Sequence, residues 1–183
     1  MKTNQKILLC SADFIRENTN ISNNLQDKFL KPAMTETQDF DLTEVFGSKM
    51  IEKLCTLVRD DEIDSDENTE YKLLLDKCQY FFAYSTISKL CLISSVKIDD
   101  IGLNLTNDEN AQQLYLTDVF KLEAHYKNKA DYYKERLQAY CKSKIDVLPE
   151  LKEGGCYDVR AELNSAASCP IFLGGARSRK RKY

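Results

Sequence analysis

The stretch FLKPAMTETQDFDLTEVFGSKMIEKL, residues 29–54, predicts a helix, a tight polar corner and a second helix. Asp39, Asp41 and Thr43 favour helix N-caps and Gly47 relaxes the backbone, so we place the corner at residues 38–41. The stretch carries no catalytic signature, and we expect it to form the base of a helical bundle. Its apolar surface is supplied by Leu30, Met34, Phe40, Leu42, Val45, Phe46, Met50, Ile51 and Leu54.

Three helical patterns extend from this stretch toward the C-terminus. Residues 43–60 repeat apolar positions at three- and four-residue spacing, which is typical of an amphipathic helix. Residues 70–95 are apolar on most faces, so this helix is expected to be central and covered on several sides. The last pattern, from residue 110 or 112 to residue 145, combines an apolar face with a basic one.

The chain before residue 29 combines an arm with the start of the first main helix. Residues 1–22 are expected to form the arm, in which Ile7–Leu9 pairs as an edge strand and Ser11 caps a short helical turn. The first main helix either begins at about Lys31, with Pro32 in its first turn, or begins at residue 22 or 24 and kinks at Pro32.

The segment Val96–Leu105 changes the apolar period from helical to alternating. This pattern predicts a hairpin-like excursion or an extended loop, which either has a binding role or is flexible. The predicted fold is mostly α: a small helical bundle with a protruding loop or β-hairpin between the two longest helices and extended N- and C-terminal tails. We divide it into an arm at 1–22, a bundle at 23–146 with its loop at 97–110, and a tail at 147–183 that follows the end of the helical body at Pro149.

Charge is distributed unevenly along the 183 residues. Residues 1–110 carry 12 Lys and Arg against 20 Asp and Glu, a net charge of −8, and residues 111–183 carry 14 against 9, a net charge of +5. A chain with this polarity suits head-to-tail self-association or contact with a charged partner at one end, although charge asymmetry is also common in ordinary proteins.

The cysteines indicate a reducing compartment and no metal site. Their number is odd, no two have Cys-x-x-Cys spacing, and His125 is the single histidine, which we interpret as a surface residue. We expect neither a metal nor a cofactor. The apolar run near the N-terminus is too short for a signal peptide, and no run approaches a membrane span, so we expect no membrane contact.

Three other patterns have a functional and a structural interpretation. The acidic residues 60–70 offer oxygen ligands but lack the glycine of a calcium loop, so we interpret them as a solvated connection. The aromatic residues 80–84 lack interleaved basic residues, which favours core packing over a nucleic-acid platform. The basic face of residues 121–144, with a net charge of +4, either meets phosphates or is a solvated or subunit-facing surface.

The tail contains two candidate contact elements. An apolar anchor, Ile171, Phe172 and Leu173, stands in a small and polar stretch that cannot bury it, so we expect a partner surface to cover it. The basic residues either bind nucleic acid or an acidic protein groove, or belong to a disordered tail. This basic cluster consists of Arg177, Arg179, Lys180, Arg181 and Lys182.

An ordered set of short motifs over residues 18–146 resembles the head–tail connector proteins of tailed bacteriophages, in the branch found in Bacteroides-infecting and crAss-like phages. The tail after Pro149, the arm and the loop at 97–110 are not matched. The matching motifs are ISNN at 21–24, KPAM at 31–34, TQDFDL at 37–42, VFGSKM at 45–50 with KL at 53–54, YKLL at 71–74, and YKNKADYYKERL at 126–137.

The resemblance implies a helical subunit of a ring, typically of about twelve copies, under the portal protein at the virion neck. DNA passes through such a ring without sequence-specific binding, and other neck or tail proteins adjoin it. The loop between the long helices would face the lumen, and the tail would reach the portal. The lumenal loop residues would be Lys97, Ile98, Asp99, Asp100, Ile101, Asp108 and Glu109, whose acidic members would repel DNA.

Two functions therefore stand as hypotheses from the sequence. The first is a structural ring protein of the virion neck, assembled in the host cytoplasm. The alternative is a nucleic-acid-binding protein that uses the basic last helix and the basic tail. An enzyme is not expected, because no catalytic constellation, Gly-x-Ser-x-Gly motif or phosphate loop is present.

Overall fold

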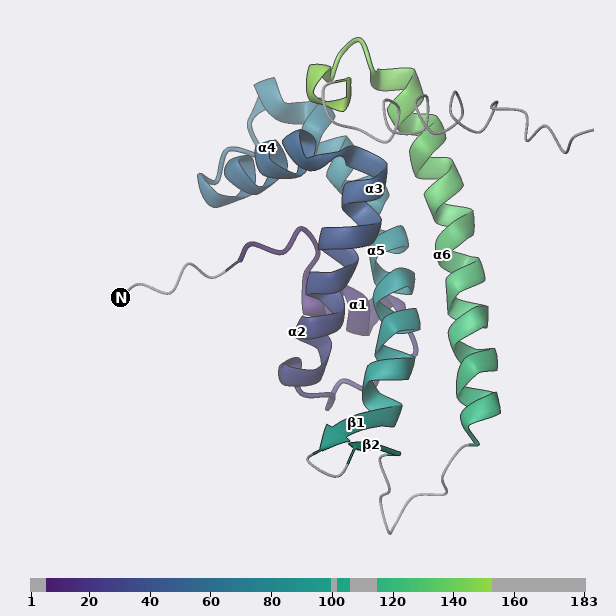
Figure 1. The fold of residues 1–183 in the computed structure, drawn as a ribbon. Coiled ribbons are helices and arrows are strands. Elements are labelled where there is room, and N and C mark those ends of the chain that lie inside the picture. The colour runs from purple at the N-terminus through teal and green to yellow at the C-terminus, as the bar shows by residue number, and fades with distance from the viewer. Residues whose placement is uncertain (1–5, 100–101, 106–114, 153–183) are drawn as a thin grey trace, which may run out of the picture.

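The computed structural model describes residues 6–99, 102–105 and 115–152, and the side chains of 6–94 and 115–152. The fold is mostly helical, as predicted, and its helices form a bundle around α5 (Figure 1). The elements are α1 Ala12–Asn18, α2 Asp27–Glu36, the π-helix η1 Thr37–Leu42, α3 Thr43–Phe46, α4 Ser48–Arg59, η2 Asp66–Asn68, α5 Thr69–Ser95, β1 Val96–Asp99, β2 Gly102–Leu105, α6 Leu116–Lys144 and η3 Pro149–Leu151.

Helix α5 is the central element, and its boundaries agree with the prediction of 70–95 to within one residue. It packs along most of its length against α6 and on another side against α2 and η1 (Figure 1). Leu74, Phe82 and Ala83 are fully buried in it, because neighbours cover it on several faces.

The predicted corner at residues 38–41 is wrong. Helix α2 contains Pro32 and continues without a break through η1 into α3. The chain turns sharply only at Gly47, where φ is 78° and ψ is 161°, a conformation that is essentially restricted to glycine. The capping preference of Asp39 and Thr43 is outweighed because η1 packs against α5 and buries Thr37, Gln38 and Leu42.

The N-terminal segment does not form the predicted edge strand at Ile7–Leu9. Gln38, which is 1% exposed, instead accepts a hydrogen bond from the backbone N–H of Leu9 at 2.9 Å and donates one to the carbonyl of Ile7 at 2.8 Å. Gln79 donates to the Leu9 carbonyl at 3.1 Å. Side-chain amides thus replace a partner strand, and Leu9 is buried in the main core.

The predicted cap at Ser11 is confirmed. Its hydroxyl accepts a hydrogen bond from the N–H of Phe14 at 3.0 Å and begins α1. Ile15 on α1 is fully buried, so the segment before residue 22 contributes to the same core as α5.

The connection between the two longest helices begins with a short antiparallel pair. Strand β1 pairs with β2 in the register Val96 opposite Leu105 and Asp99 opposite Gly102. Helix α6 begins at Leu116, four to six residues later than the predicted start at 110 or 112, and ends one residue before the predicted Ile145. The predicted loop residues Asp100, Ile101, Asp108 and Glu109, and the tail residues after 152, lie outside the described residues.

Candidate functional site

Side chains of α5 and α6 line a groove that is bordered by η1 and α3, on the face that we call the front face of the α5–α6 pair. We call it the polar groove; its volume is about 450 Å³. Five carboxylates and three ammonium groups line it, a formal charge of −2. These groups belong to Glu36, Asp41, Glu44, Glu123, Asp131, Lys89, Lys127 and Lys134.

Hydrogen bonds organise the floor and walls of the polar groove. Asp41 accepts a hydrogen bond from the Ser85 hydroxyl and lies 3.2 Å from the Lys89 ammonium group. The Ser88 hydroxyl donates to the Glu123 carboxylate at 3.2 Å, which joins α5 to α6. Because hydrogen bonds and one ion pair hold these side chains in place, the groove is a preformed polar surface.

A second surface lies on the back face of the same pair, where rings from α1, α5 and α6 interleave. We call it the tyrosine ladder: Phe14, Tyr80, Tyr133, Tyr84 and Tyr126, in spatial order. Its successive ring centroids are 5.5, 5.4, 5.6 and 6.5 Å apart. Desolvation, followed by the neighbouring tyrosines, raises the pKa of Tyr84, so the ring stays neutral and stacked.

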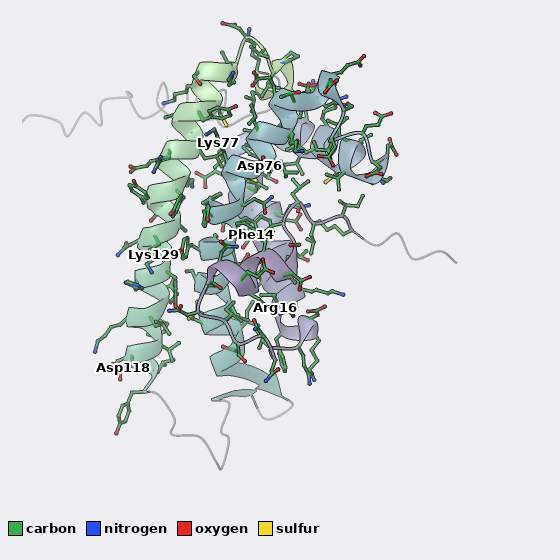
Figure 2. All side chains as sticks on the ribbon, turned by 180° about the vertical axis from the view of Figure 1, so that it is seen from behind. Phe14, Arg16, Asp76, Lys77, Asp118 and Lys129 are labelled. Atoms are coloured by element: carbon green, nitrogen blue, oxygen red, sulfur yellow. The ribbon has the colours of Figure 1, made fainter. Side chains whose placement is uncertain are left out.

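Cationic side chains lie over or beside this ladder. The Lys129 ammonium group is 5.4 Å from the ring centroids of both Tyr84 and Tyr126. Arg136 lies 5.6 Å from the ring of Tyr132, which is 55% exposed. Figure 2 shows Phe14, Lys77 and Lys129 on this back face. The face therefore offers aromatic rings and an arginine, residue types that are enriched in protein interfaces, together with two lysines.

The periodicity of α6 explains why the two surfaces are separate. Glu123, Lys127 and Lys134 recur every four or seven residues and face the polar groove. His125, Lys129 and Tyr132 recur every three or four residues but two residues out of phase with the first set, which places them about 200° away around the helix. The predicted surface position of His125 is confirmed, since its side chain is exposed.

Intramolecular contacts hold much of the predicted basic face of α6. The Lys134 ammonium group is 2.5 Å from Glu44, and Lys144 is 2.9 Å from Glu70. Lys121 pairs with Asp118 at 2.9 Å. Two further cations lie over tyrosine rings as described above. The net charge of +4 seen in the sequence is thus partly compensated by carboxylates from α3 and α5.

The described cysteines are free, and three of them are core residues. Burial raises the pKa of Cys10 and of Cys141 to about 12 and that of Cys78 well above its usual range. These thiols therefore remain protonated at neutral pH and pack as small apolar groups. Across residues 6–99, 102–105 and 115–152, no three His, Cys, Asp or Glu side chains converge into a metal-binding group.

Sequence reasoning missed both the polar groove and the tyrosine ladder as surfaces. Tyrosines recur every seven residues on α6, at 126, 133 and 140, and four residues apart on α5, at 80 and 84. This spacing predicted only that these residues belong to a core face. Of the predicted lumenal loop, Lys97, Ile98 and Asp99 lie on β1, as the backbone shows. The portal-binding residues of the tail lie outside the described part of the chain.

Residues 42–161 match the model of a family described as a family of unknown function (DUF6712), so the chain belongs to this family. The match spans α3 to η3 and therefore includes α5 and α6, whereas α1, α2 and η1 up to Asp41 lie before it. No curated protein and no solved structure matches the chain. Within the described segments, none of the helices has the length and hydropathy needed to cross a membrane.

Proposed function

We propose that this protein is a structural subunit of a ring at the neck of a tailed bacteriophage, between the portal protein and downstream neck or tail components, with DNA passing through its centre. The proposed class of protein rests on the motifs over residues 18–146, which resemble those of head–tail connector proteins. The single structural observation that carries it is the placement of the two ends of the α5–α6 pair.

Strands β1 and β2 and the short helix η3 lie at opposite ends of this pair (Figure 1). Strands β1 and β2 continue from the C-terminal end of α5. At the other end, the Tyr71 hydroxyl on α5 donates to Glu150 of η3 at 2.9 Å, just before the described chain ends at Lys152. Helix α6 spans its 29 residues, about 43 Å, between the two.

Such a subunit reaches two neighbours along one axis with a rigid helical spacer between them. In the proposed ring, residues 97–110 protrude into the lumen, and the tail with its anchor at 171–173 and its basic cluster at 177–182 contacts the portal protein. The acidic residues Asp99, Asp100, Asp108 and Glu109 keep DNA mobile by repulsion.

The direct experiment is a reconstruction of the neck of the phage whose genome encodes this chain. We expect a ring of this protein against the portal, with residues 97–110 toward the channel axis. A chain that is absent from the neck, or that carries residues 97–110 on the outer surface, would contradict the proposal.

A deletion tests the role of the tail separately. Removal of residues 171–183 is expected to leave the helical body folded, by circular dichroism, while portal binding in a co-purification assay is lost. A matched control replaces the same residues with a Gly/Ser sequence of equal length. Normal neck incorporation of the truncated chain would show that the tail is not the anchor.

The nucleic-acid-binding alternative predicts strong, salt-dependent DNA affinity of the isolated chain. The internal pairing of Lys134 with Glu44 and of Lys144 with Glu70 favours the structural function, because these two cations of the basic face already have carboxylate partners. Fluorescence anisotropy with a DNA duplex at two salt concentrations separates the two functions; tight binding that weakens steeply with salt would support the alternative.

A further inference from the structure

The polar groove and the tyrosine ladder lie on opposite faces of one helix pair and differ in charge. The groove carries a formal charge of −2. The back face, formed by the pockets that line the ladder, carries Lys77, Lys129 and Arg136 against Asp76, a formal charge of +2. The two faces are therefore complementary within a single chain.

We propose that the back face of one copy docks into the polar groove of a second copy, so that the chain assembles head to tail; this inference rests on the proposed ring and names its subunit contact. Lys129 and Arg136 of one copy meet the carboxylates of Glu36 and Asp131 of the next. A contact between two different patches of the same chain repeats in one direction and closes into a ring when its rotation permits.

Exposed apolar side chains on both faces supply the remainder of such a contact. Tyr132 on the back face is 55% exposed and carries Arg136 over its ring. Leu92 lines the groove and is 36% exposed, and Phe120, which is 51% exposed, lies on the groove side of α6 seven residues before Lys127. Aromatic and arginine side chains of this kind anchor subunit interfaces, whereas rim charges set their polarity and register.

The arrangement of the two faces favours a second copy of this chain as the binding partner over a different acidic protein. The acidic wall is built largely from α2, η1 and α3, and the basic aromatic face from α1, α5 and α6, so both halves of the interface are present on every molecule. The net charge of −3 for the full chain would otherwise oppose self-association, and opposed faces of +2 and −2 remove that repulsion at the contact.

The test is charge reversal with rescue in the full-length protein. The back-face variant is Lys129→Glu with Arg136→Glu, and the groove variant is Glu36→Lys with Asp131→Lys. Analytical ultracentrifugation at low salt should show concentration-dependent oligomers of the wild type and an increase of at least about tenfold in the dissociation constant for each variant alone. An equimolar mixture of the two variants should restore oligomers, because each then presents a face complementary to the other.

Matched controls reverse the same number of charges elsewhere. Lys28→Glu with Lys31→Glu controls for the back-face variant, and Asp60→Lys with Glu67→Lys controls for the groove variant; both should associate like the wild type. Circular dichroism checks the fold of every variant. The neutralising changes Arg136→Gln and Asp131→Asn provide a milder second pair, with smaller losses in the same direction.

A wild type that stays monomeric at every concentration, variants that associate as the wild type does, or a mixture that fails to restore association would overturn the contact. A ring located in the neck by reconstruction but insensitive to these variants would leave the proposed function in place while refuting the interface. Charge-dependent oligomers of a chain absent from the virion neck would do the reverse.

Discussion

Replacement of Gln38 by alanine is expected to detach the N-terminal segment from the helical body. The Gln38 side chain is 1% exposed, accepts from the N–H of Leu9 and donates to the carbonyl of Ile7. Each bond contributes about 1 kcal/mol net, and the N–H of Leu9 left without a partner in a buried site costs a further 1–2 kcal/mol or so. We therefore expect Gln38→Ala to lower the free energy of unfolding by about 3–4 kcal/mol.

Urea denaturation followed by circular dichroism measures the global loss. Hydrogen exchange measures the local one: if about 2 kcal/mol of the loss is local, the amide of Leu9 should exchange about thirtyfold faster. The control is Gln26→Ala, because Gln26 is exposed and its side chain makes no capping hydrogen bond. In a chain that lacks residues 1–10, Gln38→Ala should cost far less, since both of its partners are absent.

A Gln38→Ala protein within about 0.5 kcal/mol of the wild type and with unchanged protection at Leu9 would show that these hydrogen bonds do not hold the N-terminal segment. A loss of equal size in the truncated chain would also contradict the prediction. That result would mean that Gln38 stabilises η1 itself rather than the contact with residues 7–9.

Three further predictions concern buried thiols, one glycine and one ion pair. Folding raises the pKa values of Cys10 and Cys141 from 9.0 to about 12. The free energy of unfolding should therefore be highest below pH 9 and fall as pH rises, by about 1.4 kcal/mol for each thiol at pH 10. Denaturation under reducing conditions measures this fall. Gly47→Ala should cost on the order of 1–3 kcal/mol in urea denaturation, because φ is positive there. A double-mutant cycle on Lys134 and Glu44 should give a coupling of about 0.5–1 kcal/mol that shrinks in high salt.

Each of these predictions has a result that would contradict it. The range of about pH 8 to pH 10 extends about one unit on either side of the unfolded thiol pKa of 9.0. A free energy of unfolding that stays level over this range would mean that the two thiols are solvated in the fold. An alanine at position 47 without cost would place the turn elsewhere. A coupling energy that is zero at low salt would show that Lys134 and Glu44 are held together by the packing of α6 and α3 rather than by charge.

The long helices were predictable from the sequence, whereas the surfaces between them were not. Apolar residues on most faces, over more than seven turns, predicted the central helix α5. The helical segment that replaces the predicted corner was missed because Asp39, Asp41 and Thr43 have a strong local capping preference, and the tertiary packing of η1 outweighs it. Gln38 gave no local signal either, since its partners lie about thirty residues away in the chain.

The polar groove could not be predicted from the sequence either. Its central hydrogen bond joins Asp41 to Ser85, 44 residues apart, and no pattern within either segment reports that proximity. The tyrosine ladder carried a spacing signal on each helix separately, but which rings interleave depends on the axial offset of α5 and α6. That offset is set by packing along the pair and has no signature in a single sequence.

The π-helix η1 gives this chain a point of tolerance to a change in length. A π-turn closes its hydrogen bond one residue later than an α-turn and so accommodates one extra residue without breaking the helix. Phe40, at the middle of η1, is 68% exposed and so lies outside the core. Loss of one residue here would convert η1 to an ordinary α-turn and keep α2 and α3 facing α5, whereas the same loss within α5 would rotate half of that helix by about 100°. Within the helical body, deletion of a single residue is therefore expected to be tolerated better at residues 37–42 than within α5.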